Sequence, residues 1–68
     1  MSQLSSKTKV SYVAVLHNEH GTAIDEGADY DDLEWALEDG KQMVSEAVAK
    51  TGEYHYAKID IKVTPVYI

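Results

Sequence analysis

The side chains of this chain that could do chemistry are mainly carboxylates, and most of them gather in one segment. Eight of the twelve acids fall within the fifteen residues 25–39, with no lysine between them. They are Asp25, Glu26, Asp29, Asp31, Asp32, Glu34, Glu38 and Asp39. The leading interpretation is a helix start, where the helix dipole favours acids, followed by a solvated face. The alternative is an anionic surface that docks on a basic partner, and calcium is the weakest reading because the run lacks the order of a calcium loop.

The histidines give no convincing catalytic or metal site. His17, Glu19 and His20 lie close together in sequence, but a third firm ligand is missing, so they read as ordinary surface residues. His55 falls on the presumed core side of a strand, which suits a hydrogen-bonded or rim histidine. No nucleophile motif and no glycine-rich phosphate loop is present. The sequence therefore predicts a protein that is not an enzyme and carries no metal or cofactor.

A helix should begin within the acidic segment. Asp31 is a good N-cap residue with Glu34 three positions later, the spacing of a capping box. Lys50 suits the last turn, and Gly52 suits the residue beyond it that needs a positive φ. Gly40 lies in the middle of the apolar face and indicates a close approach of the helix to a sheet. That face comprises Leu33, Ala36, Leu37, Gly40, Val44, Ala47 and Val48.

Trp35 falls on the opposite side of this helix at 100° per residue. One interpretation is a hydrophobic staple in which Trp35 packs on Tyr30. The other is an exposed aromatic anchor within a field of carboxylates, a composition typical of interface hot spots.

Three strands accompany the helix. Residues 9–16 are rich in β-branched and aromatic side chains, residues 22–26 form a short second strand after a turn, and residues 53–63 alternate strictly. The order strand, strand, helix, strand predicts an α+β fold of ββαβ type, with an antiparallel sheet ordered 2-1-3 and the helix on one face. Residues 1–9 are expected to form a flexible arm and residues 10–68 a single domain. Such a sheet leaves one face uncovered.

Charge and composition narrow the class of partner. Twelve acids face six lysines without any arginine, and the formal net charge is −6. Nucleic acid and anionic membranes both need cationic contacts, so neither is expected to bind directly. No segment is apolar enough to cross a bilayer, and the N-terminus lacks the apolar region of a secretory signal. A cytoplasmic protein that binds a basic protein partner fits best.

The layout resembles the small acidic ββαβ accessory proteins of bacteriophages and mobile elements, which include anti-CRISPR and anti-restriction inhibitors. The resemblance rests on VSYVAVLHNEHGTAI as a hairpin, DYDDLEWALEDGKQMV as an acid-capped helix and AKIDIKVTPV as a closing strand. The segment GADYDDLEWALEDGKQMV is also similar to the helix of HicB-type antitoxins, although the proline- and glycine-containing strand segment before that helix is missing. The first resemblance implies an inhibitor of a host protein, acting in the host cytoplasm.

Two functions follow as hypotheses. The first is a protein-binding module that occupies a basic, nucleic-acid-binding surface of its partner. Its predicted contact residues are Trp35 as anchor and six carboxylates as steering charges: Asp31, Asp32, Glu34, Glu38, Asp39 and Glu46. The alternative is a structural homo-oligomer, such as a dimer, formed through the open sheet face or a sheet edge and helped by the apolar C-terminal VYI.

Overall fold

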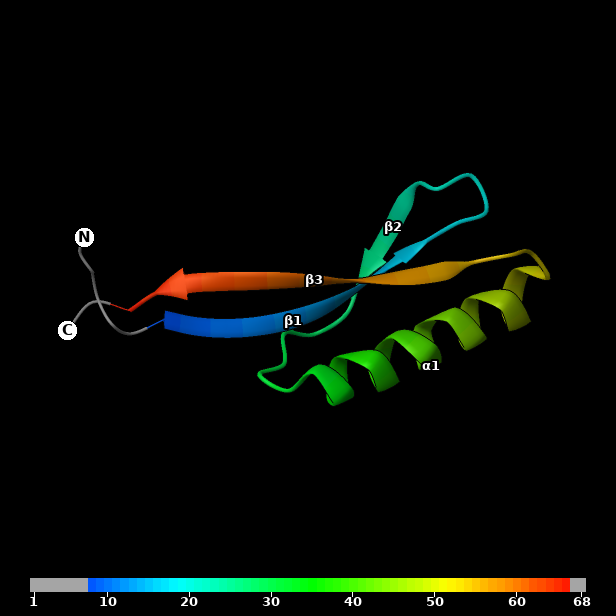
Figure 1. The fold of residues 1–68 in the computed structure, drawn as a ribbon. Coiled ribbons are helices and arrows are strands. Elements are labelled where there is room, and N and C mark those ends of the chain that lie inside the picture. The colour runs from blue at the N-terminus through cyan, green and yellow to red at the C-terminus, as the bar shows by residue number, and fades with distance from the viewer. Residues whose placement is uncertain (1–7, 67–68) are drawn as a thin grey trace.

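The computed structural model describes residues 8–66 and contains three strands and one helix (Figure 1). The elements are β1 (Thr8–His17), β2 (Ala23–Glu26), α1 (Leu33–Thr51) and β3 (Tyr56–Pro65). Both strand pairs are antiparallel, and the sheet order is β2-β1-β3. The predicted α+β class, the ββαβ element order and the 2-1-3 sheet are therefore confirmed.

The ends of the strands differ from expectation by a few residues. β1 begins at Thr8, one residue before the strand predicted over residues 9–16, and Thr8 and Lys9 at the end of the predicted arm lie opposite Pro65 and Thr64. Cross-strand pairing of this kind overrides their polar composition. The rest of the predicted arm, and Tyr67 and Ile68 of the apolar C-terminus, lie outside the described residues. Pro65 is the last residue of β3, a position where its missing N–H is tolerated.

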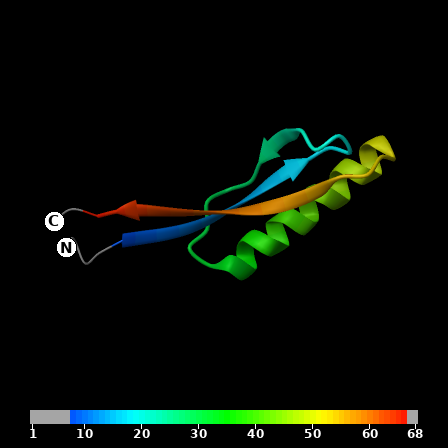
Figure 2. The ribbon, with the colours of Figure 1, turned by 45° about the horizontal axis from the view of Figure 1, so that its top comes forward.

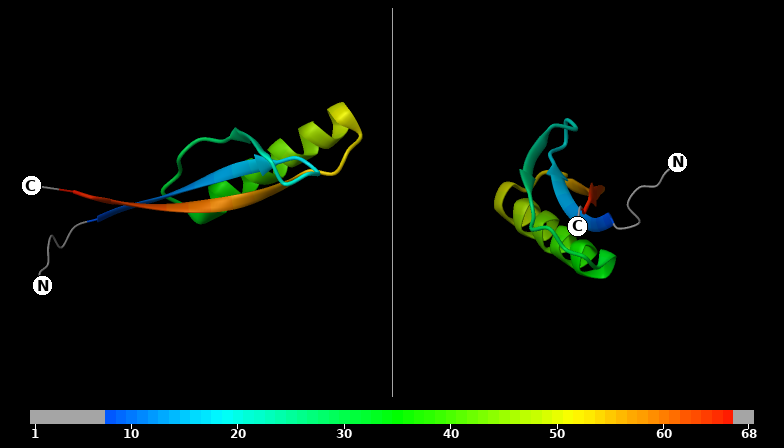
Figure 3. Two further views of the ribbon diagram at one scale, coloured as in Figure 1. Left: turned by 90° about the horizontal axis from the view of Figure 1, so that it is seen from above. Right: turned by 90° about the vertical axis from the view of Figure 1, so that its left-hand side faces the viewer.

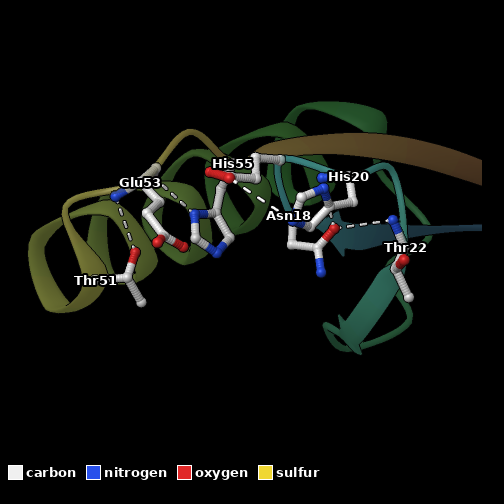
Figure 4. Close-up of polar contacts among 7 residues, drawn as sticks. Asn18, His20, Thr22, Thr51, Glu53 and His55 are labelled. Carbon is white, nitrogen blue, oxygen red and sulfur yellow. Dashed lines mark hydrogen bonds and ion pairs between the residues drawn. The ribbon is translucent and has the colours of Figure 1, made fainter.

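The turn between β1 and β2 is organised by Asn18 and Gly21, as the sequence indicates. The Asn18 side-chain oxygen accepts hydrogen bonds from the backbone N–H groups of His20 at 2.9 Å and Thr22 at 3.0 Å (Figure 4). Gly21 has a φ of 83°, a conformation that glycine adopts without steric cost. The hairpin therefore closes through local polar chemistry.

The helix begins one residue later than the sequence suggested. Asp32, in place of Asp31, is the N-cap, and its carboxylate accepts a hydrogen bond of 2.9 Å from the Glu34 backbone N–H. In this frame the residue three after the cap is Trp35, so the predicted capping box with Glu34 is wrong. At the other end Gly52 has a φ of 73°, and its N–H donates to the Val48 carbonyl at 2.7 Å, as predicted.

The cap assignment gives a direct prediction for two neighbouring aspartates. Replacing Asp32 with alanine removes the acceptor for an otherwise unpaired helix N–H and should lower the free energy of unfolding by about 1 kcal/mol. Asp31→Ala removes the same charge without the hydrogen bond and should change it by less than about 0.5 kcal/mol. Urea unfolding followed by circular dichroism compares the two variants. A larger loss of unfolding free energy for Asp31→Ala than for Asp32→Ala would show that Asp31 is the N-cap.

The helix crosses one face of the sheet, as Figures 2 and 3 show. Its closest approach is at Gly40, where an added Cβ would lie 3.2 Å from the Cβ of Ala14 and 3.4 Å from that of Ala57. The small residues at this crossing confirm the inference drawn from Gly40. The helix residues that are buried are Ala36 and Gly40, whereas Leu37, on the predicted apolar face, is largely exposed. The apolar face of α1 is thus wider than the sheet beneath it.

The sheet face opposite the helix is less open than expected. Val13 and Val15 lie there, but Val13 is 0% exposed and Val15 is also buried. Across the ladder they face Asp60 and Lys58. Long lysine stems can cover apolar neighbours while the ammonium group stays in water. The sheet face that the helix leaves uncovered therefore does not expose these two valines.

The exposed apolar side chains lie elsewhere, on the part of the sheet that extends beyond the helix. The paired ends of β1 and β3 project as a two-stranded ribbon past the start of α1 (Figure 1). On this ribbon Ile61 is 65% and Val63 is 60% exposed, although both lie on the helix side of the sheet. The radius of gyration is 15.1 Å, against about 11 Å for a compact chain of this length.

Candidate interaction surfaces

The first candidate surface lies at the start of α1 and centres on Trp35. The indole is 63% exposed, in agreement with its predicted position away from the sheet. Trp35 and the half-buried Tyr30 line one shallow depression, but with Asp32 as the N-cap they do not occupy the N′ and N4 positions of a hydrophobic staple. Most of the indole nevertheless remains accessible to a partner.

Tyr30 is held in place by backbone pairing with β1. Its carbonyl accepts from the Tyr12 N–H at 2.7 Å, and its own N–H donates to the Tyr12 carbonyl at 2.9 Å. This isolated bridge extends the edge of β1 beyond β2 and fixes the chain two residues before the N-cap. The start of α1, and with it Trp35, is thereby anchored to the sheet.

Four of the predicted carboxylates lie around this anchor. Asp31, Asp32, Glu34 and Glu38 are all exposed, and Glu34 and Glu38 line a depression together with Trp35. Glu38 also forms an exposed ion pair with Lys41, at 3.3 Å between Nζ and Oε2. We call these four carboxylates and Trp35 the acidic surface.

The other two predicted contact residues are placed differently. Asp39 is half-buried, and its Oδ2 accepts a hydrogen bond of 3.3 Å from the Ala28 backbone N–H. A Cβ added at Gly27 would collide with this carboxylate, so Asp39 also depends on a glycine in the loop. Glu46 lies eleven residues after Trp35, about 16 Å along the axis, and its carboxylate accepts from Gln42 at 3.3 Å. Asp39 tethers the loop, and Glu46 lies apart from the acidic surface.

His17 and His20, near the hairpin, contact different residues and do not form a common site. The His17 ring stacks on Tyr56, with centroids 4.9 Å apart and an interplanar angle of 5°. Glu19 and His20 lie 3.7 Å apart on the exposed loop. Within residues 8–66 no group of three potential ligands converges on one point.

His55 is buried beside the end of α1. Its Nδ1–H donates to the Glu53 carbonyl at 2.9 Å, in the short connection between Thr51 and β3 (Figure 4). The neighbouring Glu53 N–H donates to the Thr51 hydroxyl oxygen at 3.1 Å. A buried histidine that is satisfied by its own connection agrees with the structural interpretation of this residue.

The second candidate surface is a groove of about 780 Å³ between α1 and the outer edge of β3. Its apolar lining comes from Leu37, Val44 and Val48 of the helix and from Ala57 and Ile59 of the strand. Sequence reasoning assigned these side chains to the core and did not foresee a groove. The wide apolar stripe of the helix could have indicated the groove, since a single three-stranded sheet can cover only part of such a stripe.

No helix among residues 8–66 is long and apolar enough to cross a membrane. No protein-family model, curated protein or solved structure matches this chain.

Proposed function

We propose that this chain is a protein-binding module whose acidic surface docks on a basic surface of another protein. The observation that carries the proposal is the 63% exposure of Trp35 between the exposed carboxylates of Glu34 and Glu38. A large aromatic side chain left in water costs free energy, and its burial on a partner regains it. Tryptophan is the residue type most enriched among interface hot spots.

The distribution of charge supports the same proposal. No lysine occurs between Lys9 and Lys41, a stretch that includes the hairpin, the loop and the first two turns of α1. Lys58 and Lys62 lie on the sheet face opposite the helix. Lys41, which lines the same depression as Trp35 and pairs with Glu38, offsets one of the four carboxylates of the acidic surface. The surface keeps a net negative charge, which would accelerate the approach of a cationic partner and orient it.

The class of partner follows from this charge. Surfaces with a dense positive field are typical of proteins that hold a nucleic acid backbone. A carboxylate surface seated there would exclude the nucleic acid, which makes an inhibitor of a host nucleic-acid-binding protein the specific form of the proposal. This form agrees with the resemblance to small phage inhibitors.

Capture from a host lysate at low and high salt tests the proposal. The tagged chain should retain basic proteins at low ionic strength and lose them as salt screens the charges. Glu34→Gln/Glu38→Gln removes two charges beside Trp35 and should weaken capture severalfold. The matched control Glu19→Gln/Glu53→Gln removes two exposed charges away from the acidic surface and should leave capture nearly unchanged.

Two results would contradict the proposal. Capture that is insensitive to salt would show that charge does not drive binding. Equal losses in the two double variants would show that net charge matters and that the acidic surface does not. For each captured protein, displacement of its nucleic acid by the added chain then tests the inhibitor form directly.

A further inference from the structure

We propose that the free edge of β3 pairs with the same edge of a second copy of this chain, forming a two-fold symmetric dimer with one continuous six-stranded sheet. The inference goes beyond the acidic surface and uses none of its residues. Among residues 8–66 no strand pairs with the outer edge of β3, which leaves its hydrogen-bonding groups free. The inference rests on these groups, on the charges along β3 and on the apolar groove beside it.

The backbone groups at this edge follow from the contacts of β1. Both the N–H and the carbonyl of Tyr12 bond to Tyr30, and the Ala14 carbonyl accepts from Gly27, so these groups of β1 point away from β3. In an antiparallel pair, the residues opposite them also direct their groups away from the shared ladder. The free edge therefore presents the N–H and C=O groups of Ala57, Ile59, Ile61 and Val63.

Charge and the position of Pro65 together select the register of the pairing. A two-fold axis at Ile59 sets Lys58 of each copy opposite Asp60 of the other, which gives two attractive cross-strand pairs. An axis at Asp60 would oppose two aspartates and is disfavoured. An axis at Ile61 would also give two attractive pairs, between Asp60 and Lys62, but it would set Pro65 opposite Ala57, where a backbone donor is needed and proline has none.

The axis at Ile59 also places the two helices at packing distance. Gly40 is nearly equidistant from Ala14 of β1 and Ala57 of β3, so α1 lies over the midline between these strands. Each helix is then about one strand spacing from the two-fold axis, and the two helices are about 9.6 Å apart. Helices pack at about 8–10 Å. The exposed Leu37 lines the groove and so lies on the flank of α1 that turns toward the axis.

The same register fills the groove. Ile61 of one copy lies opposite Ala57 of the other, and Val63 lies opposite His55, which also lines the groove. The two most exposed aliphatic side chains of the ribbon thus enter the apolar space beneath Val44 and Val48 of the second copy. The ribbon that extends past its own helix is covered by the helix of the partner copy.

A second copy would also enlarge the small apolar core of the single chain. The buried apolar core of the described residues consists of Val13, Ala14, Val15, Leu16 and Ala36. A core of this size provides little net stability, and small domains commonly compensate by oligomerisation. A standard interface takes about 800 Å² from each partner, roughly one-sixth of the 4919 Å² surface of this chain.

Disulfide trapping tests the register, because the chain has no cysteine of its own. Directly opposite residues in a hydrogen-bonded antiparallel pair have Cα atoms about 5.5 Å apart, within the range of a disulfide. Ile59→Cys should therefore form a covalent dimer under mild oxidation, whereas Ile61→Cys alone should not. The double variant Ala57→Cys/Ile61→Cys should cross-link again, since these two residues face each other across the interface.

Light scattering on the unmodified chain provides an independent measurement. We expect twice the 7.6 kDa mass of the chain at micromolar concentration. Lys58→Glu should shift the protein to monomer by opposing acids at two positions, and Lys58→Glu/Asp60→Lys should restore the dimer. A monomeric wild-type protein would overturn the proposal, as would cross-linking of Ile61→Cys without that of Ile59→Cys. None of these measurements involves the basic partner, so they succeed or fail independently of the proposed function.

Discussion

Replacement of Gly40 with leucine is expected to lower the free energy of unfolding by about 1–3 kcal/mol or more, a large part of the stability of so small a domain. Even a Cβ at this position would lie 3.2 Å from the Cβ of Ala14, closer than an ordinary van der Waals contact, and 3.4 Å from that of Ala57, at the lower limit of such a contact. The remaining atoms of leucine have no space unless α1 moves away from the sheet. Thermal unfolding followed by circular dichroism measures the loss.

The matched control is Gln42→Leu on the exposed side of the same helix. It introduces the same side chain and removes only the weak contact of Gln42 with Glu46, so its effect should stay within about 0.5 kcal/mol. A harmless Gly40→Leu substitution would mean that α1 contacts the sheet through a different face.

Replacement of Trp35 with alanine should lower affinity for the partner and leave the stability of the fold nearly unchanged. If the indole anchors the partner, affinity should fall by about 2 kcal/mol, roughly thirtyfold. Because the indole is 63% exposed, the free energy of unfolding should change little. The small change should come from lost packing in the depression that Trp35 and Tyr30 line together. Titration calorimetry with the captured partner and urea unfolding of the same variant separate the two effects.

Trp35→Phe is the informative companion, since phenylalanine keeps an aromatic ring and loses area and the indole N–H. Its affinity should lie between those of the wild type and Trp35→Ala. Unfolding of Trp35→Ala with unchanged partner affinity in the surviving folded fraction would identify Trp35 as a staple, and the proposed function would lose its anchor.

Local chemistry in the sequence was enough to predict much of this fold. The alternation at residues 56–63 indicates which side chains of β3 share a face, because strand geometry has a period of two. The turn at Asn18 and Gly21 and the helix end at Gly52 depend on conformations that only a few residue types adopt readily. The close contact at Gly40 could be inferred because a glycine within an apolar helix face has little other use.

The exact helix start and the fate of individual acids depended on contacts distant in sequence. Asp31 and Asp32 are equally good caps by residue type, and the bridge between Tyr12 and Tyr30 sets where the chain turns into the helix. Asp39 could not be told from its neighbours in the acidic run, because its partner, the Ala28 N–H, lies eleven residues away. The role of this carboxylate in tethering the loop is visible only in the tertiary structure.

The sequence by itself determined the elements, their order and which side chains of each strand share a face, since these follow from the periods of strand and helix and from local turn chemistry. The tertiary structure decided which apolar residues remain uncovered. Hydrophobicity assigns Leu37, Ile61 and Val63 to a core, but whether a side chain is buried depends on what lies above it. The helix begins only part of the way along the β1–β3 ladder and sits over its midline, so these side chains are left at the free edge of β3 and on the projecting ribbon.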